Sequence, residues 1–241
     1  MKIKEIYSPN FDTKKRTKKL IKFIIIHYTG MQSERESIKR LCNVRSKVSS
    51  HYLINKKGKI YRLINDSDVA WHAGKSYWKK YKNLNKNSIG IELVNKGHKF
   101  GYENFSNEQI SSLLKLCKVL ILKYKIKRRN IIGHSDIAPL RKSDPGEKFP
   151  WEYLAKNRIG IWHNHKPNFL KKIRKVNVSK KTDFKNFLNN LSRIGYYSKY
   201  KKKFFLSKLI KAFQRHFRKE LINGFLDKEC LVISENLIKK L

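Results

Sequence analysis

Apolar residues in the first two thirds of the chain alternate between short runs typical of strands and longer segments with helical spacing. The run at 23–26 is fully apolar and branched, which is typical of a strand buried on both faces. The segment 88–95 indicates another strand, which carries one acidic side chain, and the runs at 51–54 and 60–64 flank a glycine turn, which predicts a hairpin. This alternation predicts a mixed α/β domain.

A helix is predicted after Ser106, where the sequence Ser-Asn-Glu-Gln has the form of a capping box. Apolar residues then recur at helical spacing, namely Ile110, Leu113, Leu114, Cys117, Leu120 and Ile121. The apolar run at 131–132 follows and leads through Gly133 into His134. We therefore expect a central mixed β-sheet flanked by helices.

The pattern changes in the last third of the chain. We assign residues 1–165 to one domain, the polar and basic segment 166–181 to a linker, and residues 182–241 to a small three-helix domain. Gly195 ends the first of these helices, and Asp227 is placed to cap the third. About 60 residues are too few for a second enzyme, so any chemistry is expected in the first domain.

The chain is strongly basic. Its 241 residues include 57 Lys and Arg against 18 Asp and Glu, a formal net charge of +39. The lysines are spread from end to end and accompany many Ile and Asn residues, as in a genome of biased composition. A solvated surface and attraction to an acidic polymer both remain open, and nucleic acid is one such polymer.

No apolar stretch reaches the ~18 residues of a membrane helix, and the N-terminus lacks the apolar segment of a signal peptide. The sequence therefore indicates either the cytoplasm, or an export signal that lies outside this chain or is unconventional. Three cysteines stand far apart and without CxxC spacing, which argues against a disulfide framework or a cysteine-based zinc site; these are Cys42, Cys117 and Cys230.

Two histidines follow strand-like runs. His27 follows the strand at 23–26, His134 follows the run at 131–133, and Asp144 stands in a loop further on. Two imidazoles and one carboxylate, with a fourth position left for water, make a competent catalytic zinc site. Spacing alone leaves open that these histidines are ordinary core or surface residues.

Glu92 and Lys142 strengthen the case for chemistry. Glu92 interrupts an apolar strand, where an unpaired carboxylate is costly, so it is a candidate general base; the alternative is an edge strand with Glu92 in solvent. Lys142 lies two residues before Asp144 and is placed to stabilise an oxyanion, unless it is one more surface lysine.

Several short motifs in this order resemble the zinc-dependent N-acetylmuramoyl-L-alanine amidases of the type 2 amidase family. They extend over roughly residues 20 to 162 and comprise His27-Tyr28-Thr29, Val48 to Ile54, Trp71-His72-Ala73-Gly74, Ser88 to Glu92, His134 to Pro139, Arg141 to Gly146, and Phe149-Pro150-Trp151. Within the family the likeness is to the AmpD and AmiD branch.

The resemblance implies a central sheet with the active site in a groove above it. It implies one zinc ion held by His27, His134 and Asp144, with Glu92 taking a proton from the zinc-bound water and Lys142 stabilising the tetrahedral intermediate. Other branches of the family have a catalytic tyrosine before the histidine of the His51 segment and a cysteine as third ligand. This chain has Ser50 and Asp144 there, which fits the branch that uses the glutamate.

The resemblance also places His51, His72 and Trp71 near the groove, as candidate contacts to substrate. A structural imidazole is the alternative for each histidine, and core packing is the alternative for Trp71. Asp136 is expected to support the site or cap its loop rather than bind metal. The three C-terminal helices resemble the peptidoglycan-binding module often joined to such amidases.

The implied function is hydrolysis of the amide between N-acetylmuramic acid, or its anhydro form, and the L-alanine of the stem peptide, in wall degradation, remodelling or recycling. The expected partner is peptidoglycan or its fragments. Two alternatives stay open: a protein that recognises peptidoglycan without cutting it, and a nucleic-acid-binding protein. A wall-binding module favours the periplasm or cell envelope, whereas the absent signal peptide favours the cytoplasm.

Overall fold

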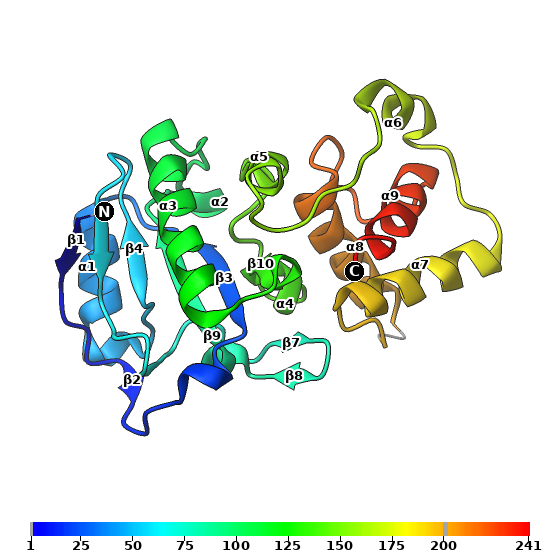
Figure 1. Cartoon of the computed structure of the whole chain (residues 1–241). Coiled ribbons are helices and arrows are strands. Elements are labelled where there is room, and N and C mark those ends of the chain that lie inside the picture. The colour runs from blue at the N-terminus through cyan, green and yellow to red at the C-terminus, as the bar shows by residue number, and fades with distance from the viewer. Residues whose placement is uncertain (1, 200–201) are drawn as a thin grey trace.

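A six-stranded mixed sheet is the centre of the computed structural model, which describes residues 2–199 and 202–241 (Figure 1). Its strands are β1 (Ile3–Glu5), β3 (Phe23–Tyr28), β4 (Tyr52–Ile54), β5 (Ile60–Arg62), β9 (Ser88–Leu93) and β10 (Ile131–Gly133). The strand order is β1-β5-β4-β9-β3-β10. The pairs are parallel except β4 with β5, the predicted hairpin.

Two short antiparallel ribbons lie outside this sheet. They are β2 (Phe11–Asp12) with β6 (Val69–Ala70), and β7 (Tyr77–Trp78) with β8 (Tyr81–Lys82). The helices are α1 (Glu34–Cys42), α2 (Gly97–Phe100), α3 (Asn107–Tyr124), α4 (His134–Ile137), α5 (Trp151–Lys156), α6 (Pro167–Ile173), α7 (Lys181–Ile194), α8 (Lys203–Phe217) and α9 (Lys228–Ile238).

Strand β3 is buried on both faces, as its unbroken apolar run predicts. Ile24 and Ile26 belong to the apolar cluster that includes α3, whereas Phe23 and Ile25 point the other way. Helix α3 starts where predicted, with the Ser106 side chain accepting a hydrogen bond from the backbone N–H of Gln109. The expected central sheet flanked by helices is confirmed.

The C-terminal helices pack against the first domain. Their apolar side chains form one continuous cluster with Phe23 and Ile25 of β3 and with Trp78 of β7. Trp78 is 1% exposed and lies edge-on against Tyr196 at 4.8 Å between ring centroids. Helices α7, α8 and α9 therefore share an apolar cluster with one face of the sheet. Figure 1 shows these helices on the side of the sheet where β10 and α4 lie.

One helix, α6, lies within the segment that the sequence predicts as a linker. Pro167 occupies its first turn, where a missing N–H is harmless, and Leu170 is buried against the C-terminal helices. A single apolar anchor in a polar segment is too weak a signal to indicate a helix from sequence. In the part of the chain that the structure describes, no helix is long and apolar enough to cross a membrane.

Candidate active site

The register of the parallel strands brings three chemically important side chains close together. His27 of β3 is paired with Glu92 of β9, and Ile26 of β3 is paired with Gly133 of β10, so His134 comes next to His27. Because the carboxyl ends of parallel strands meet at one edge of a sheet, these side chains gather there. Strand β9 lies between β4 and β3, so the alternative that Glu92 is on an edge strand is wrong.

His27, His134 and Asp144 bring three atoms together in a small triangle. The two Nδ1 atoms are 2.9 Å apart, and Oδ2 of Asp144 lies 3.0 Å from each. All three residues are buried. Ligand atoms of a tetrahedral zinc ion with bonds of about 2.0–2.1 Å are separated by roughly 3.3 Å, close to these distances.

The triangle fits a metal better than it fits hydrogen bonds. A proton on one corner can point at only one of the other two atoms, so at least one close pair of lone pairs would face each other. A cation above the triangle is attracted to all three. The donor set of two imidazoles and one carboxylate also leaves a position open for water.

The distal side of each imidazole is held in place. Nε2 of His27 lies 3.0 Å from Nδ1 of His72, and Nε2 of His134 lies 3.2 Å from the carbonyl oxygen of Ala73. A ring that binds metal through Nδ1 carries its proton on Nε2, so both rings have an acceptor for that proton. Such partners fix the tautomer and orientation of a ligand.

The protonation states suit metal binding. Burial and the neighbouring His134 lower the pKa of His27 to about 4, so its ring is neutral near pH 7. Burial alone would raise the pKa of Asp144, but its interactions with His134 and His27 dominate and hold that pKa far below its usual range. A neutral imidazole and an ionised carboxylate are the forms that bind metals.

Glu92 lies beside the triangle, and one oxygen of its carboxylate is without a hydrogen-bond partner in the described part of the chain. Its Oε2 is buried and has no hydrogen-bond partner among the described residues. Burial, followed by the charge of Asp144, raises the pKa of Glu92 to about 8, and Lys142 opposes this shift. A carboxyl with a pKa near neutrality is matched to proton transfer.

Lys142 precedes Asp144 by two positions in the chain. Its side chain is exposed, yet its charge acts on both His27 and Glu92, so it lies close to the cluster. The backbone N–H of Lys142 donates to the carbonyl oxygen of Ala138, which fixes the start of the loop carrying Asp144. This position allows a role in stabilising negative charge.

His72 contacts the ring nitrogen of His27 that does not belong to the triangle. Its ring covers Gly90 so closely that a Cβ there would lie 2.5 Å from it, which explains a glycine inside β9. Beyond His27, its second contact is with the hydroxyl of Ser88 at 3.2 Å. These contacts favour a structural imidazole that orients His27.

His51 is fully buried. Nδ1 of His51 accepts a hydrogen bond from the N–H of Gly90 at 3.0 Å, and its Nε2 lies 2.7 Å from Nη2 of Arg16. These contacts also favour the structural alternative. Trp71 is half-buried and donates through Nε1 to Oδ1 of Asp12 at 2.7 Å, and its contact with substrate stays a prediction.

Two groups beside the site, Tyr28 and Asp136, have partners that the sequence does not indicate. Tyr28, next to His27, contacts Nδ1 of His98 at 2.9 Å, and His98 in turn contacts Glu147 at 3.1 Å. Asp136 is bonded to Tyr196 and His216 of the C-terminal part. These partners are 49 to 80 positions apart in sequence, so no local pattern could reveal them.

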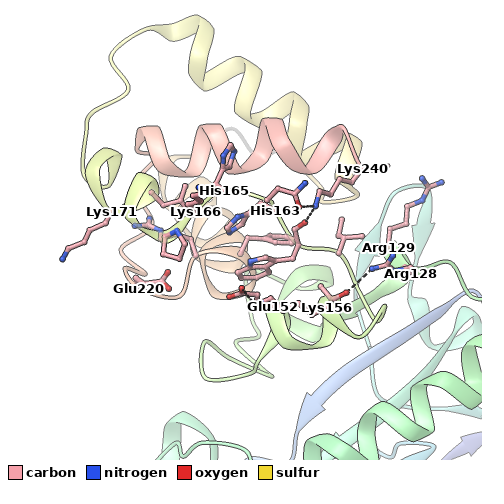
Figure 2. A pocket seen from close by; sticks show the side chains of 18 of the residues that line it. Arg128, Arg129, Glu152, Lys156, His163, His165, Lys166, Lys171, Glu220 and Lys240 are labelled. Atoms are coloured by element: carbon pink, nitrogen blue, oxygen red, sulfur yellow. Dashed lines mark hydrogen bonds and ion pairs between the residues drawn. The ribbon is translucent and has the colours of Figure 1, made fainter.

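A cavity of about 1370 Å³ lies away from the cluster, between the first domain and the C-terminal helices (Figure 2). Arg128, Arg129 and Lys156 line it from the first domain, and Lys166 and Lys171 line it from the segment containing α6. Two lining residues are acidic, Glu152 and Glu220. The cavity is therefore suited to anionic groups.

Comparison with known proteins agrees with this geometry. The family model described as N-acetylmuramoyl-L-alanine amidase matches residues 16–147, which include the triangle, Glu92 and Lys142. The chain is 38% identical over 238 residues to N-acetylmuramoyl-L-alanine amidase AmiD of Escherichia coli (strain K12), covering 91% of this chain and 83% of that protein.

Two solved structures share the whole arrangement. The complex of AmiD from E. coli with the substrate anhydro-N-acetylmuramic acid-L-Ala-D-gamma-Glu-L-Lys has a TM-score of 0.80 and 37% identity, covering 92% of this chain and 90% of that one. AmpDh3 from Pseudomonas aeruginosa in complex with anhydromuramic pentapeptide has a TM-score of 0.81 and 32% identity, covering 96% of both chains. The C-terminal helices are thus part of the likeness.

Proposed function

This chain belongs to the N-acetylmuramoyl-L-alanine amidase family, and we propose that it hydrolyses its substrate with a metal-activated water and Glu92 as base. The bond is the amide between N-acetylmuramic acid, or its anhydro form, and the L-alanine of the stem peptide. The observation that carries the mechanism is the juxtaposition of the His27, His134 and Asp144 triangle with the buried, unpartnered Oε2 of Glu92.

We propose Zn²⁺ as the metal and His27, His134 and Asp144 as its protein ligands. When bound, zinc supplies a Lewis acid that lowers the pKa of a water molecule and polarises a carbonyl. The set of two nitrogens and one oxygen is a common ligand set for catalytic zinc. His72 and the Ala73 carbonyl keep the two rings oriented.

In this proposal Glu92 transfers the protons and Lys142 stabilises the negative charge. Glu92 accepts a proton from the attacking water, and its raised pKa makes it able to return that proton to the departing amine of L-alanine. Lys142 stabilises the oxygen that becomes negative as the carbonyl is attacked. The C–N bond breaks, and a free carboxyl and a free amine result.

The substrate proposal includes polymeric peptidoglycan as well as soluble fragments. The solved relatives hold anhydromuropeptides, and stem peptides carry several carboxylates. The basic cavity beside the C-terminal helices offers cations to such carboxylates at a distance from the metal triangle. Because a second contact of this kind suits a polymer better than a small fragment, we propose the cell envelope as the place of action.

The test is mass spectrometry of the products from intact sacculi and, separately, from a soluble anhydro-muramyl tripeptide, with and without a zinc chelator. Chelator-sensitive release of stem peptides from sacculi supports the whole proposal. Cleavage of the soluble fragment alone keeps the chemistry and moves the function to recycling. Binding of sacculi without cleavage, equal for wild type and Glu92→Gln, would establish the recognition protein instead.

A further inference from the structure

One buried carboxylate joins the metal-binding segment to the C-terminal helices. Asp136 is 1% exposed and accepts hydrogen bonds from the Gly133 N–H at 2.7 Å, the Tyr196 hydroxyl at 2.5 Å and Nδ1 of His216 at 2.7 Å. Gly133 directly precedes the ligand His134. Two of the three hydrogen bonds to Asp136 therefore come from residues in the last 46 positions of the 241-residue chain.

His216 also reaches the segment around His134 through a stacked ring, that of Trp151. The His216 ring lies 3.9 Å from the Trp151 ring with an angle of 13° between their planes. Trp151 packs on Gly133, where an added Cβ would lie 3.3 Å from its ring and 2.7 Å from Cδ of Pro145. Pro145 directly follows the ligand Asp144, so His216 is in indirect contact with both ligand segments.

A further hydrogen bond joins the two ligand segments. The N–H of Ser135, directly after His134, donates to the backbone carbonyl oxygen of Asp144 at 2.8 Å. A shift of α4 is thereby transmitted to Asp144. Helices α4 and α8 are in contact, which places the residues around His216 against this segment.

We propose that Tyr196 and His216 are positioning residues for the metal site, so that the C-terminal helices are an integral part of the catalytic unit. This inference rests on the metal set of the proposed function. Neither residue touches the metal ligands. They hold Asp136, Asp136 holds the Gly133 N–H, and Gly133 sets the direction from which His134 enters the site.

The physical reason is the cost of an unpartnered buried carboxylate. Without the Tyr196 hydroxyl and the His216 N–H, Asp136 would lose two of its three partners in a site that water does not reach. It would rotate toward solvent or another donor and release the Gly133 N–H. The ligand triangle, whose sides are 2.9 to 3.0 Å, would then be less well preorganised.

The experiment measures the affinity of the full-length chain for Zn²⁺ by competition with a chromophoric chelator. We expect the double variant Tyr196→Phe/His216→Leu to raise the dissociation constant about 10–100-fold, the range typical for lost partners of metal ligands. His216→Asn keeps an N–H near the position of Nδ1 and should lie close to wild type. The d–d spectrum of the Co²⁺-loaded protein should change in parallel.

Phe187→Leu is the matched control. Phe187 is fully buried in α7 and contacts Phe213. Phe187→Leu therefore loosens the packing of the C-terminal helices while both Tyr196 and His216, the donors to Asp136, stay in the chain. The proposal is supported if Phe187→Leu and the double variant lose the same thermal stability but only the double variant binds Zn²⁺ more weakly. Affinities within twofold of wild type, or an equal loss in Phe187→Leu, overturn it.

Two further outcomes also test the proposal: a double variant that does not fold, and a wild-type chain that binds no Zn²⁺. If the double variant does not fold, Tyr196→Phe alone is compared with Phe187→Leu, because it removes one hydroxyl and changes no packing volume otherwise. If the wild-type chain itself binds no Zn²⁺, the metal of the proposed function is overturned, and this inference with it.

Discussion

The Nδ1 atoms of His27 and His134 lie 2.9 Å apart, although 107 positions separate the two residues. Parallel pairing of β3 with β10 brings them together, and Asp144 completes the triangle from a loop. Close, buried lone pairs repel one another unless a proton or a metal ion lies between them. The folded chain without metal therefore contains an electrostatic cost that a bound cation relieves.

Zinc should stabilise the fold measurably. At a free concentration 100 times the dissociation constant, binding adds about 2.7 kcal/mol to the free energy of unfolding. For a chain of this size we expect a rise in Tm of roughly 5–10 °C, measured by calorimetry. Asp144→Ala should abolish the rise, whereas His98→Ala, outside the triangle, should retain it. A rise preserved in Asp144→Ala would contradict the assigned ligands.

The raised pKa of Glu92 predicts how the metal-free protein responds to pH. Its pKa is about 8 in the folded chain against 4.5 for an ordinary glutamate, so the folded state holds a proton that the unfolded state loses. The contribution of Glu92 is therefore greatest below pH 4.5 and is lost as the pH rises toward 8. Thermal melts with chelator should show Glu92→Gln gaining stability over wild type across this range. A difference that does not vary with pH would contradict the raised pKa.

The two proposed catalytic residues outside the metal set should affect turnover rather than metal binding. Glu92→Gln removes the base and should lower kcat by about 10²–10⁴-fold. Lys142→Ala should lower it by about 10²–10³-fold, the usual loss for one group that stabilises an oxyanion. Steady-state kinetics on the soluble tripeptide, with zinc content measured in parallel, checks both. Lys148→Ala, which removes a nearby exposed lysine, should change kcat little.

His51 should matter for stability and not for substrate affinity. Burial and the charge of Arg16 lower the pKa of His51 to about 3, so it is a neutral acceptor for the Gly90 N–H. His51→Ala leaves buried groups unpaired, and we expect a loss of roughly 1–3 kcal/mol in the free energy of unfolding. Urea unfolding measures this loss, and KM of the folded fraction should stay within twofold of wild type. A large rise in KM at normal stability would restore the substrate-contact interpretation.

If the basic cavity binds carboxylates of the polymer, its positive charge should speed the cleavage of sacculi but not of the soluble tripeptide. Lys166→Glu/Lys171→Glu should slow cleavage of sacculi several-fold at low salt and leave the soluble tripeptide unaffected, because only the polymer reaches both sites. Lys115→Glu/Lys118→Glu on the exposed side of α3 changes the net charge equally and serves as the control. Equal slowing by both pairs, or a wild-type rate that does not fall with ionic strength, would count against this use of the cavity.

The sequence by itself determined the elements that carry the site. The apolar run at 23–26 predicts a strand buried on both faces, and β3 is such a strand, because branched side chains with no polar alternation leave no face for water. Glu92 is visible as a costly carboxylate in an apolar segment, and the raised pKa follows from the same cost. The order of the motifs identified the family, which the comparisons show.

The tertiary structure decided what depends on distant residues meeting. Four contacts show this: His27 with His72, His51 with the Asp68 carbonyl oxygen, and Asp136 with both Tyr196 and His216. Each joins residues that are 17 to 80 positions apart in the sequence. Such contacts leave no periodicity, since their geometry is set by strand register and by which helices cover the sheet. The sequence predicts a C-terminal three-helix domain after a linker, and only the folded chain reveals that these helices share an apolar cluster with the sheet and that Tyr196 and His216 bond Asp136, close to His134 in the chain.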